Sequence, residues 1–267
     1  MSEAAHARPA STVLLLRDSA GSDGAGELEI FMMVRHHQIE FNSGALVFPG
    51  GSVDPGDHDI AADPALYHGG EGLDAQALAF RIAGIRETFE ESGILLAKPR
   101  GSHDMLSPAR AAEIGGAFRA TGDKDKGFLR TLADNAILLT LGELVPYAHW
   151  ITPEGMPKRF DTHFFLAAAP PEQVGAHDGL ESTDSIWISP REALAGGASG
   201  RFKLPFPTTR NLIKLGKYRT VADALDAAKS SPIVTVMPVM TRLNGGRQLR
   251  IPAEAGYDGE LFEVGAV

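Results

Sequence analysis

Three glutamates in one short segment carry the strongest chemical signal in the chain. The segment reads Arg86-Glu87-Thr88-Phe89-Glu90-Glu91-Ser92-Gly93-Ile94. In a helix, Glu87, Glu90 and Glu91 are spaced i, i+3 and i+4, so their carboxylates share one face. Like charges at this spacing repel each other, and a cation that prefers oxygen ligands, such as Mg²⁺ or Mn²⁺, would remove the repulsion. The pattern favours a metal site over the alternative, a solvated acidic face.

The helix that carries these glutamates is predicted to begin after Asp74 and to end at Gly93. Apolar residues recur with helical spacing between positions 77 and 89. A glycine directly after the last polar residues is a common helix stop. Upstream, a short strand at 45–48 ends at Pro49-Gly50-Gly51, a strong turn signal. The glutamates are therefore expected on a helix that follows a strand and a turn.

The rest of the chain mixes strands and helices without a regular alternation. Runs at 12–17 and 29–35 around a Gly/Ser-rich stretch predict a hairpin, and 136–152, 159–168 and 185–188 predict further strands. Helices are predicted within 108–135, from 190 onward, and twice within 208–229. Residues 51–72 are predicted to form a long loop and 231–267 an extended tail. The fold class that follows is α+β, with a sheet between helices.

The amino-acid composition excludes several classes of protein. The 267 residues include 25 basic and 34 acidic side chains, a formal charge of −9, and no cysteine. Disulfide scaffolds, cysteine-based zinc fingers and thiol nucleophiles are excluded, and no nucleic-acid partner is expected of so acidic a chain. No run approaches the about 20 apolar residues that cross a bilayer, and residues 265–267 are no peroxisomal address. We expect one domain over 1–267, cytoplasmic and without a membrane partner; a homodimer is left open.

The glutamate segment resembles the signature of the Nudix hydrolase superfamily. That signature reads Gly-x5-Glu-x7-Arg-Glu-U-x-Glu-Glu-x-Gly-U, where U is aliphatic. The matching positions are Gly51, Arg86, Glu87, Glu90, Glu91, Gly93 and Ile94. Asp57 occupies the place of the first glutamate and Thr88 that of an aliphatic residue. The signature is also split, because 28 residues rather than 7 separate Asp57 from Arg86, which is 21 extra.

The split resembles the peroxisomal coenzyme A diphosphatases and their bacterial relatives. Further similarities lie at 44–51, at Trp150-Ile-Thr-Pro153 and at Arg159-Phe-Asp-Thr162. The coenzyme A motif carries an arginine four residues before Gly44, where this chain has Glu40. The resemblance implies a Nudix-type α/β/α sandwich with a mixed sheet: a core at about 11–195, an insertion at 58–85 and a helical C-terminal extension at 196–267. The extra residues are expected to form a surface loop beside the site.

The resemblance also implies an activity, namely metal-dependent hydrolysis of a nucleoside diphosphate linked to some moiety X. The metal ligands would be Glu87, Glu90, Glu91 and the carbonyl oxygen of Gly50. Arg86 would hold a neighbouring carboxylate through a bidentate pair. The general base is left open between Glu87 and Glu181.

Substrate contacts are expected from Arg35, Gly51 and Arg159. Gly51 lets the backbone approach a phosphate closely, because it has no Cβ. Arg35 ends a strand near the site, and Arg159 could equally pair with a surface acid. The small-molecule partner would be a nucleotide conjugate, with coenzyme A or acyl-coenzyme A as the first choice. ADP-ribose, a dinucleotide, or a non-catalytic nucleotide-sensing or interaction module are the alternatives.

Overall fold

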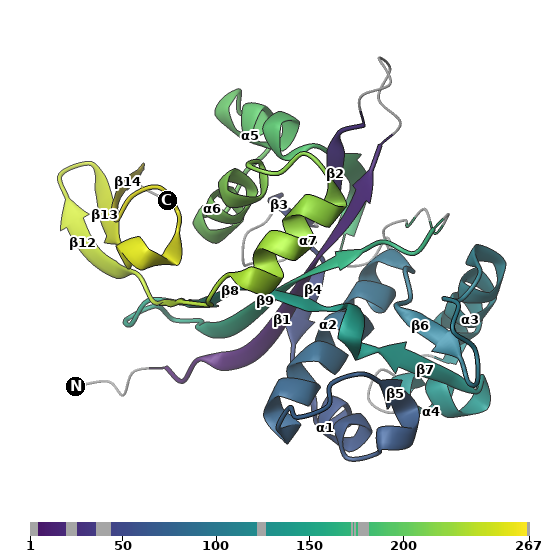
Figure 1. The fold of residues 1–267 in the computed structure, drawn as a ribbon. Helices are drawn as coiled ribbons and strands as arrows, with labels where there is room; N and C mark the ends of the chain where they lie inside the picture. Colours follow the sequence, from purple (N-terminus) through teal and green to yellow (C-terminus); the bar gives the residue numbers. More distant parts are fainter. Residues whose placement is uncertain are drawn as a thin grey trace.

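The computed structural model describes residues 5–19, 26–35, 44–121, 127–171, 173, 175 and 182–265. Its centre is a mixed sheet in which the strands follow the order β10-β2-β1-β9-β8-β11 (Figure 1). The short strand β3 pairs with β2, and β4 pairs with β1. The strands span β1 (Arg8–Asp18), β2 (Leu28–Arg35), β3 (Leu46–Val47), β4 (Gly50–Ser52), β8 (Val145–Ile151), β9 (Phe160–Ala168), β10 (Ser182–Ile188) and β11 (Thr235–Val236).

Strand β1 shows why the sheet is covered on both faces. Val13 and Leu15 point to one side and Leu14 and Leu16 to the other, and all four are fully buried. β1 pairs antiparallel with β2 and parallel with β9, so the sheet is mixed. Buried apolar clusters lie on each face. The predicted hairpin and the predicted α/β/α sandwich with a mixed sheet are confirmed.

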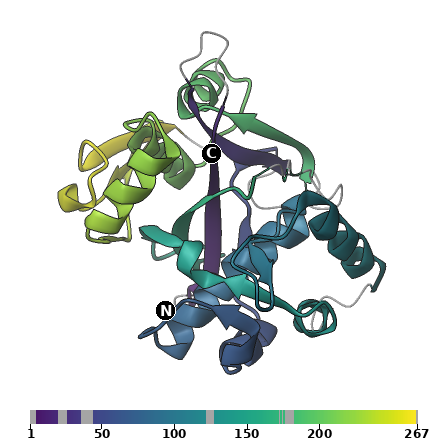
Figure 2. The same cartoon turned by 45° about the vertical axis from the view of Figure 1, so that its right-hand side comes forward.

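Two different layers cover the sheet (Figure 2). One holds α1 (Pro55–Ala61), α2 (Ala75–Ser92), α3 (Pro108–Thr121), α4 (Gly127–Asp134) and a small sheet in the order β5 (Tyr67–His68), β7 (Ile137–Thr140) and β6 (Ala97–Pro99). The other holds α5 (Pro190–Ala198), α6 (Phe206–Leu215) and α7 (Val221–Ser230). Within the described ranges, no helix is long and apolar enough to cross a membrane.

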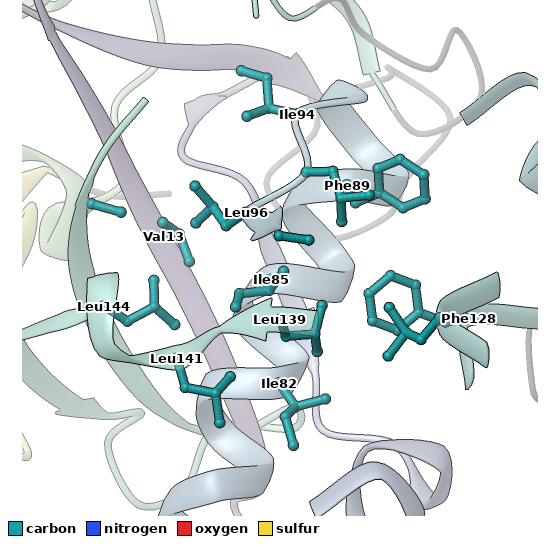
Figure 3. Packing of buried hydrophobic residues seen from close by; sticks show 14 of the residues in the cluster. Val13, Ile82, Ile85, Phe89, Ile94, Leu96, Phe128, Leu139, Leu141 and Leu144 are labelled. Atoms are coloured by element: carbon teal, nitrogen blue, oxygen red, sulfur yellow. The ribbon is translucent and has the colours of Figure 1, made fainter. Parts of the chain in front are cut away.

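Helix α2 lies in the middle of the molecule, and its limits agree with the prediction. The Asp74 side chain accepts a hydrogen bond from the Ala77 amide at 2.8 Å, which caps the first turn. Gly93 ends the helix in the left-handed conformation, at φ 73°. The apolar side chains of α2 pack between β1 and the small sheet (Figure 3). Gly84 makes this approach possible, because a Cβ there would lie 2.8 Å from the Ser11 Oγ on β1.

The prediction of a long loop over 51–72 is wrong. These residues contain α1, a 3₁₀ turn at Pro64–Leu66 and strand β5, which pairs parallel with β7. Asp54 caps α1 in a reciprocal capping box, with Pro55 directly after it, and this pattern starts a helix even in a Gly/Asp-rich stretch. Ile60 and Leu66 lie in the apolar core. The expected surface loop is therefore part of the folded layer above the sheet.

The C-terminal segment also differs from the expected extended tail. After α6 and α7, as predicted for 208–229, β11 pairs with β8. A separate antiparallel sheet then follows, in the order β12 (Val239–Leu243), β13 (Gly246–Arg250) and β14 (Leu261–Gly265), with a 3₁₀ turn at Ala253–Ala255. The Trp150 indole N–H donates to the Tyr257 hydroxyl at 2.9 Å and ties this segment to β8. The extension is thus helical first and a sheet at its end.

Candidate functional site

Arg86 is the hub of the predicted site. Its side chain is almost completely buried, and its Nε and Nη2 donate to the two carboxylate oxygens of Asp57 at 2.8 and 2.9 Å. Nη2 also donates to the Ser52 carbonyl oxygen, and Nη1 donates to Glu87 Oε1, both at 2.9 Å. Glu90 Oε2 lies 3.6 Å from Nη1. One guanidinium therefore joins α1, β4 and the glutamates of α2.

The charges around Arg86 keep its guanidinium ionised. Burial would lower the pKa of Arg86, but the hydrogen bonds to Asp57 and the charges of Glu87, Asp57 and Glu90 together raise it above its usual value. Asp57 is fully buried. The two parallel hydrogen bonds to Asp57 fix the orientation of the Arg86 guanidinium. The hydrogen bond from Arg86 to Glu87 therefore holds Glu87 in one orientation.

The Gly50-Gly51 turn lies directly against the glutamates of α2. The Gly50 amide donates to Glu91 Oε2 at 2.8 Å. A Cβ on Gly51 would lie 2.5 Å from the Glu87 carboxylate, and one on Gly50 would lie 2.4 Å from the Ser11 carbonyl oxygen. Strand β4 holds the turn there, because it pairs with β1. Only glycine permits this approach of backbone and carboxylates.

We call Glu87, Glu90, Glu91 and Gly50 the carboxylate site. All four can offer oxygen atoms, the donor type that Mg²⁺ and Mn²⁺ prefer. The missing Cβ of Gly51 leaves a cradle in which the Glu87 carboxylate faces bare backbone. This donor set fits a hard divalent cation.

The other predicted site residues are placed less fully. Glu181 lies outside the described residues. Arg35 ends β2, and its side chain also lies outside the described part. Arg159 donates to the carbonyl oxygens of Thr152 at 3.1 Å and Ala5 at 2.9 Å. The structure therefore gives Arg159, just before β9, backbone partners and a contact with the Met237 sulfur, and neither of the contacts expected from the sequence appears among those described.

Sequence reasoning missed the partner of Arg86 and a second group of side chains. The sequence feature that could have identified Asp57 as the partner of Arg86 was its position six residues after Gly51, where the signature has a glutamate. The second group is His149, Asp161 and His163, and one ligand atom from each lies within 4.8 Å of the others. His149 directly precedes one of the motifs noted above, while Asp161 lies inside the other and His163 follows it. Only the pairing of β8 with β9 brings them together.

Comparisons with known proteins show the family that this chain resembles. The family model of the NUDT19 Nudix domain matches residues 68–215. The chain is 29% identical to an acyl-coenzyme A diphosphatase NUDT19 of Gallus gallus, over 82% of this chain and 70% of that protein. It is 27% identical to a putative nudix hydrolase 7 of Caenorhabditis elegans, over 71% of this chain and 56% of the relative.

Among solved structures, a NUDIX hydrolase from Alicyclobacillus acidocaldarius superposes with a TM-score of 0.69 at 26% identity. The match covers 85% of this chain and 99% of that one. By contrast, the chain spans a little over half of the Caenorhabditis elegans relative. The likeness extends over most of this chain, but over only part of the Caenorhabditis elegans and Gallus gallus relatives.

Proposed function

Since this chain belongs to the NUDT19 Nudix domain family, we propose that it hydrolyses the diphosphate linkage of a nucleotide conjugate. The single observation that carries the proposal is the Arg86–Asp57 pair, which holds α2 and its glutamates against the Gly50-Gly51 turn. The acyl-coenzyme A diphosphatase of Gallus gallus supports coenzyme A or an acyl-coenzyme A as the conjugate. A cytoplasmic location remains a prediction from the sequence.

Nudix hydrolases use divalent metal ions, and we propose Mg²⁺ or Mn²⁺ for this chain. The carboxylates of Glu87, Glu90 and Glu91 and the carbonyl oxygen of Gly50 would hold it. Such an ion neutralises the diphosphate and lowers the pKa of a bound water. The oxygen donors and the glycine cradle support this assignment.

The protein's own groups have separate roles in the proposed reaction. Water attacks one phosphorus, a new P–O bond forms, the bridging P–O bond breaks, and the two halves of the conjugate leave, each ending in a phosphate monoester. We assign removal of the water's proton to Glu87 or Glu181. Arg86 is a positioning residue, because it holds Glu87 through a 2.9 Å hydrogen bond. Gly51, with Arg35 and Arg159, is proposed to contact the substrate.

A turnover screen tests this function. Purified protein, first stripped of metal, is incubated with coenzyme A, an acyl-coenzyme A, ADP-ribose and NADH, each with Mg²⁺ or Mn²⁺, and products are identified by mass. We expect 4′-phosphopantetheine, or its acyl form, and adenosine 3′,5′-bisphosphate from a coenzyme A substrate, and no product until a divalent ion is added.

Undiminished turnover after exhaustive chelation would overturn the metal-dependent mechanism. Faster cleavage of ADP-ribose or NADH than of either coenzyme A substrate would overturn the substrate assignment while leaving the diphosphatase assignment intact. A folded protein that turns over none of the four conjugates, yet binds one of them, would support the sensing alternative.

A further inference from the structure

His149, Asp161 and His163 occupy adjoining positions on two paired strands. His149 on β8 is the register partner of His163 on β9. Asp161 precedes His163 by two residues, so both side chains lie on the same face of the sheet. Phe80 of α2 packs on the His163 ring, with centroids 4.1 Å apart, which places the group on the face that α2 covers. We call these three residues the histidine cluster.

The histidine cluster is separate from the carboxylate site. Gly51 is the register partner of Ser11, and Ser11 is in turn that of His163. Two strand spacings therefore separate Gly51 from His163, roughly 10 Å. Helix α2 crosses both places, because Glu87 meets Gly51 while Phe80 meets His163.

We propose that the histidine cluster binds one divalent transition-metal ion of the zinc class through His149 Nε2, the Asp161 carboxylate and one ring nitrogen of His163. Two imidazoles and a carboxylate are a ligand set that such ions favour, whereas Mg²⁺ prefers oxygen alone. The proposal does not depend on the proposed hydrolase activity.

The orientation of His149 is the first support for this site. Its Nδ1 lies 2.8 Å from the Thr235 hydroxyl on β11, so its Nε2 is directed at Asp161 Oδ1, 2.5 Å away. An imidazole lone pair and a carboxylate repel each other unless a proton or a metal ion lies between them. Holding one ring nitrogen by a hydrogen bond while the other faces the metal is the usual arrangement of histidine ligands.

The setting of His163 is the second support. Its ring is stacked on His149 with centroids 4.1 Å apart and lies against Phe80 on α2. The charged side chains of Arg81 and Asp161 lie near this ring. Arg81 also repels a cation, and the Asp161 carboxylate offsets that charge.

The distances require only a small adjustment. Ligand atoms in a tetrahedral zinc site lie about 3.4 Å apart, given bonds of about 2.1 Å. The three ligand atoms here lie within 4.8 Å of one another, and on binding His149 Nε2 and Asp161 Oδ1, now 2.5 Å apart, would separate by about 1 Å. His149 and Asp161 remain partly exposed, at 15% and 31% of the side chain, which allows ions to enter. Three protein ligands leave a fourth position for water.

Calorimetry with Zn²⁺, and visible absorption with Co²⁺ in its place, test the site. Full-length protein without an affinity tag is stripped of metal and titrated. The variants are His163→Phe, which keeps a ring against Phe80, and Asp161→Asn, which keeps the shape of a partly exposed side chain. His103→Ala, an exposed histidine in a loop, is the matched control, and Glu91→Gln reports on the carboxylate site.

We expect wild type, His103→Ala and Glu91→Gln each to bind a zinc ion that produces the Co²⁺ absorption of an imidazole-ligated site. His163→Phe and Asp161→Asn should weaken this binding by about 100-fold or more. Unchanged affinity in a folded His163→Phe or Asp161→Asn protein would overturn the proposal. So would loss of all Zn²⁺ binding in Glu91→Gln, because the ion would then belong to the carboxylate site. Failure of wild type to bind Zn²⁺ would also overturn it.

Discussion

Helix α2 takes part in both the carboxylate site and the histidine cluster, but the two groups of side chains are assembled in different ways. In the carboxylate site, three of the four groups come from one turn of α2, and glycine backbone from β4 completes it. In the histidine cluster, two strands supply all three groups, and α2 only covers them through Phe80. Helical spacing brings the three glutamates together, whereas the register of β8 against β9 brings the histidine cluster together.

The two regions also differ in charge balance. Arg86 contacts Asp57 and Glu87 at 2.8–2.9 Å and lies 3.6 Å from Glu90, so part of the negative charge is already compensated. The histidine cluster has one carboxylate beside two rings that are neutral when deprotonated. The same helix therefore supplies the carboxylates of an anionic site and covers a less charged group of side chains about two strands away.

The largest expected effect separates the charge of the carboxylate site from its shape. Glu91→Gln removes one anionic oxygen but keeps an amide oxygen that can still accept from the Gly50 amide. We expect kcat to fall by about 10³-fold, or about 4 kcal/mol in the barrier, with little change in stability. Steady-state kinetics and thermal unfolding measure the two quantities.

Glu113→Gln is the matched control for this change, because it makes the same substitution on an exposed helix position. Its kcat should equal that of wild type. Wild-type turnover in a folded Glu91→Gln protein would contradict the metal-ligand role and favour the non-catalytic alternative.

A second change tests the buried Arg86–Asp57 pair, which positions the glutamates of the carboxylate site. Asp57→Asn leaves the Arg86 guanidinium buried with its main counter-charge removed. The free energy of unfolding should fall by about 3 kcal/mol, since an uncompensated buried charge is costly. Urea denaturation measures it, and Asp59→Asn, an exposed position on the same helix, should stay within about 0.5 kcal/mol of wild type. Equal stability of the two variants would show that Arg86 does not need this partner.

The smallest expected effect concerns Thr88, which lies on α2 beside Glu87 where the signature has an aliphatic residue. Its Oγ1 is buried and has no hydrogen-bond partner among the described residues. Thr88→Val should therefore leave the protein as stable as wild type or raise its unfolding free energy by up to about 1 kcal/mol. The urea midpoint measures the change.

Thr131→Val provides the contrast, because Thr131 Oγ1 donates to the Gly127 carbonyl oxygen at 2.7 Å. That variant should lose about 1 kcal/mol. A loss of the same size in Thr88→Val would mean that the Thr88 hydroxyl has a partner in solution.

The prediction for the residues inserted between Asp57 and Arg86 was wrong. Their glycines and prolines predict a surface loop, yet Ile60 and Leu66 lie in the core and the insertion supplies β5 and the first half of α2. Turn residues report only local conformation, whereas burial depends on what packs above them. Phe80, inside this insertion, is also the residue that covers His163.

The sequence by itself determined the fold class, the sheet between helices, the limits of α2 and the shared face of its three glutamates. These follow from local rules, because helical spacing and a glycine stop act over a few residues. Only the tertiary structure decided the partner of Arg86, which lies 29 residues upstream of it beyond the insertion, and the sheet formed by the last strands. It also decided the histidine cluster, because a shift of one residue in the register of β8 against β9 would turn His149 to the opposite face. Register is fixed by burial across the whole sheet, and no local pattern records it.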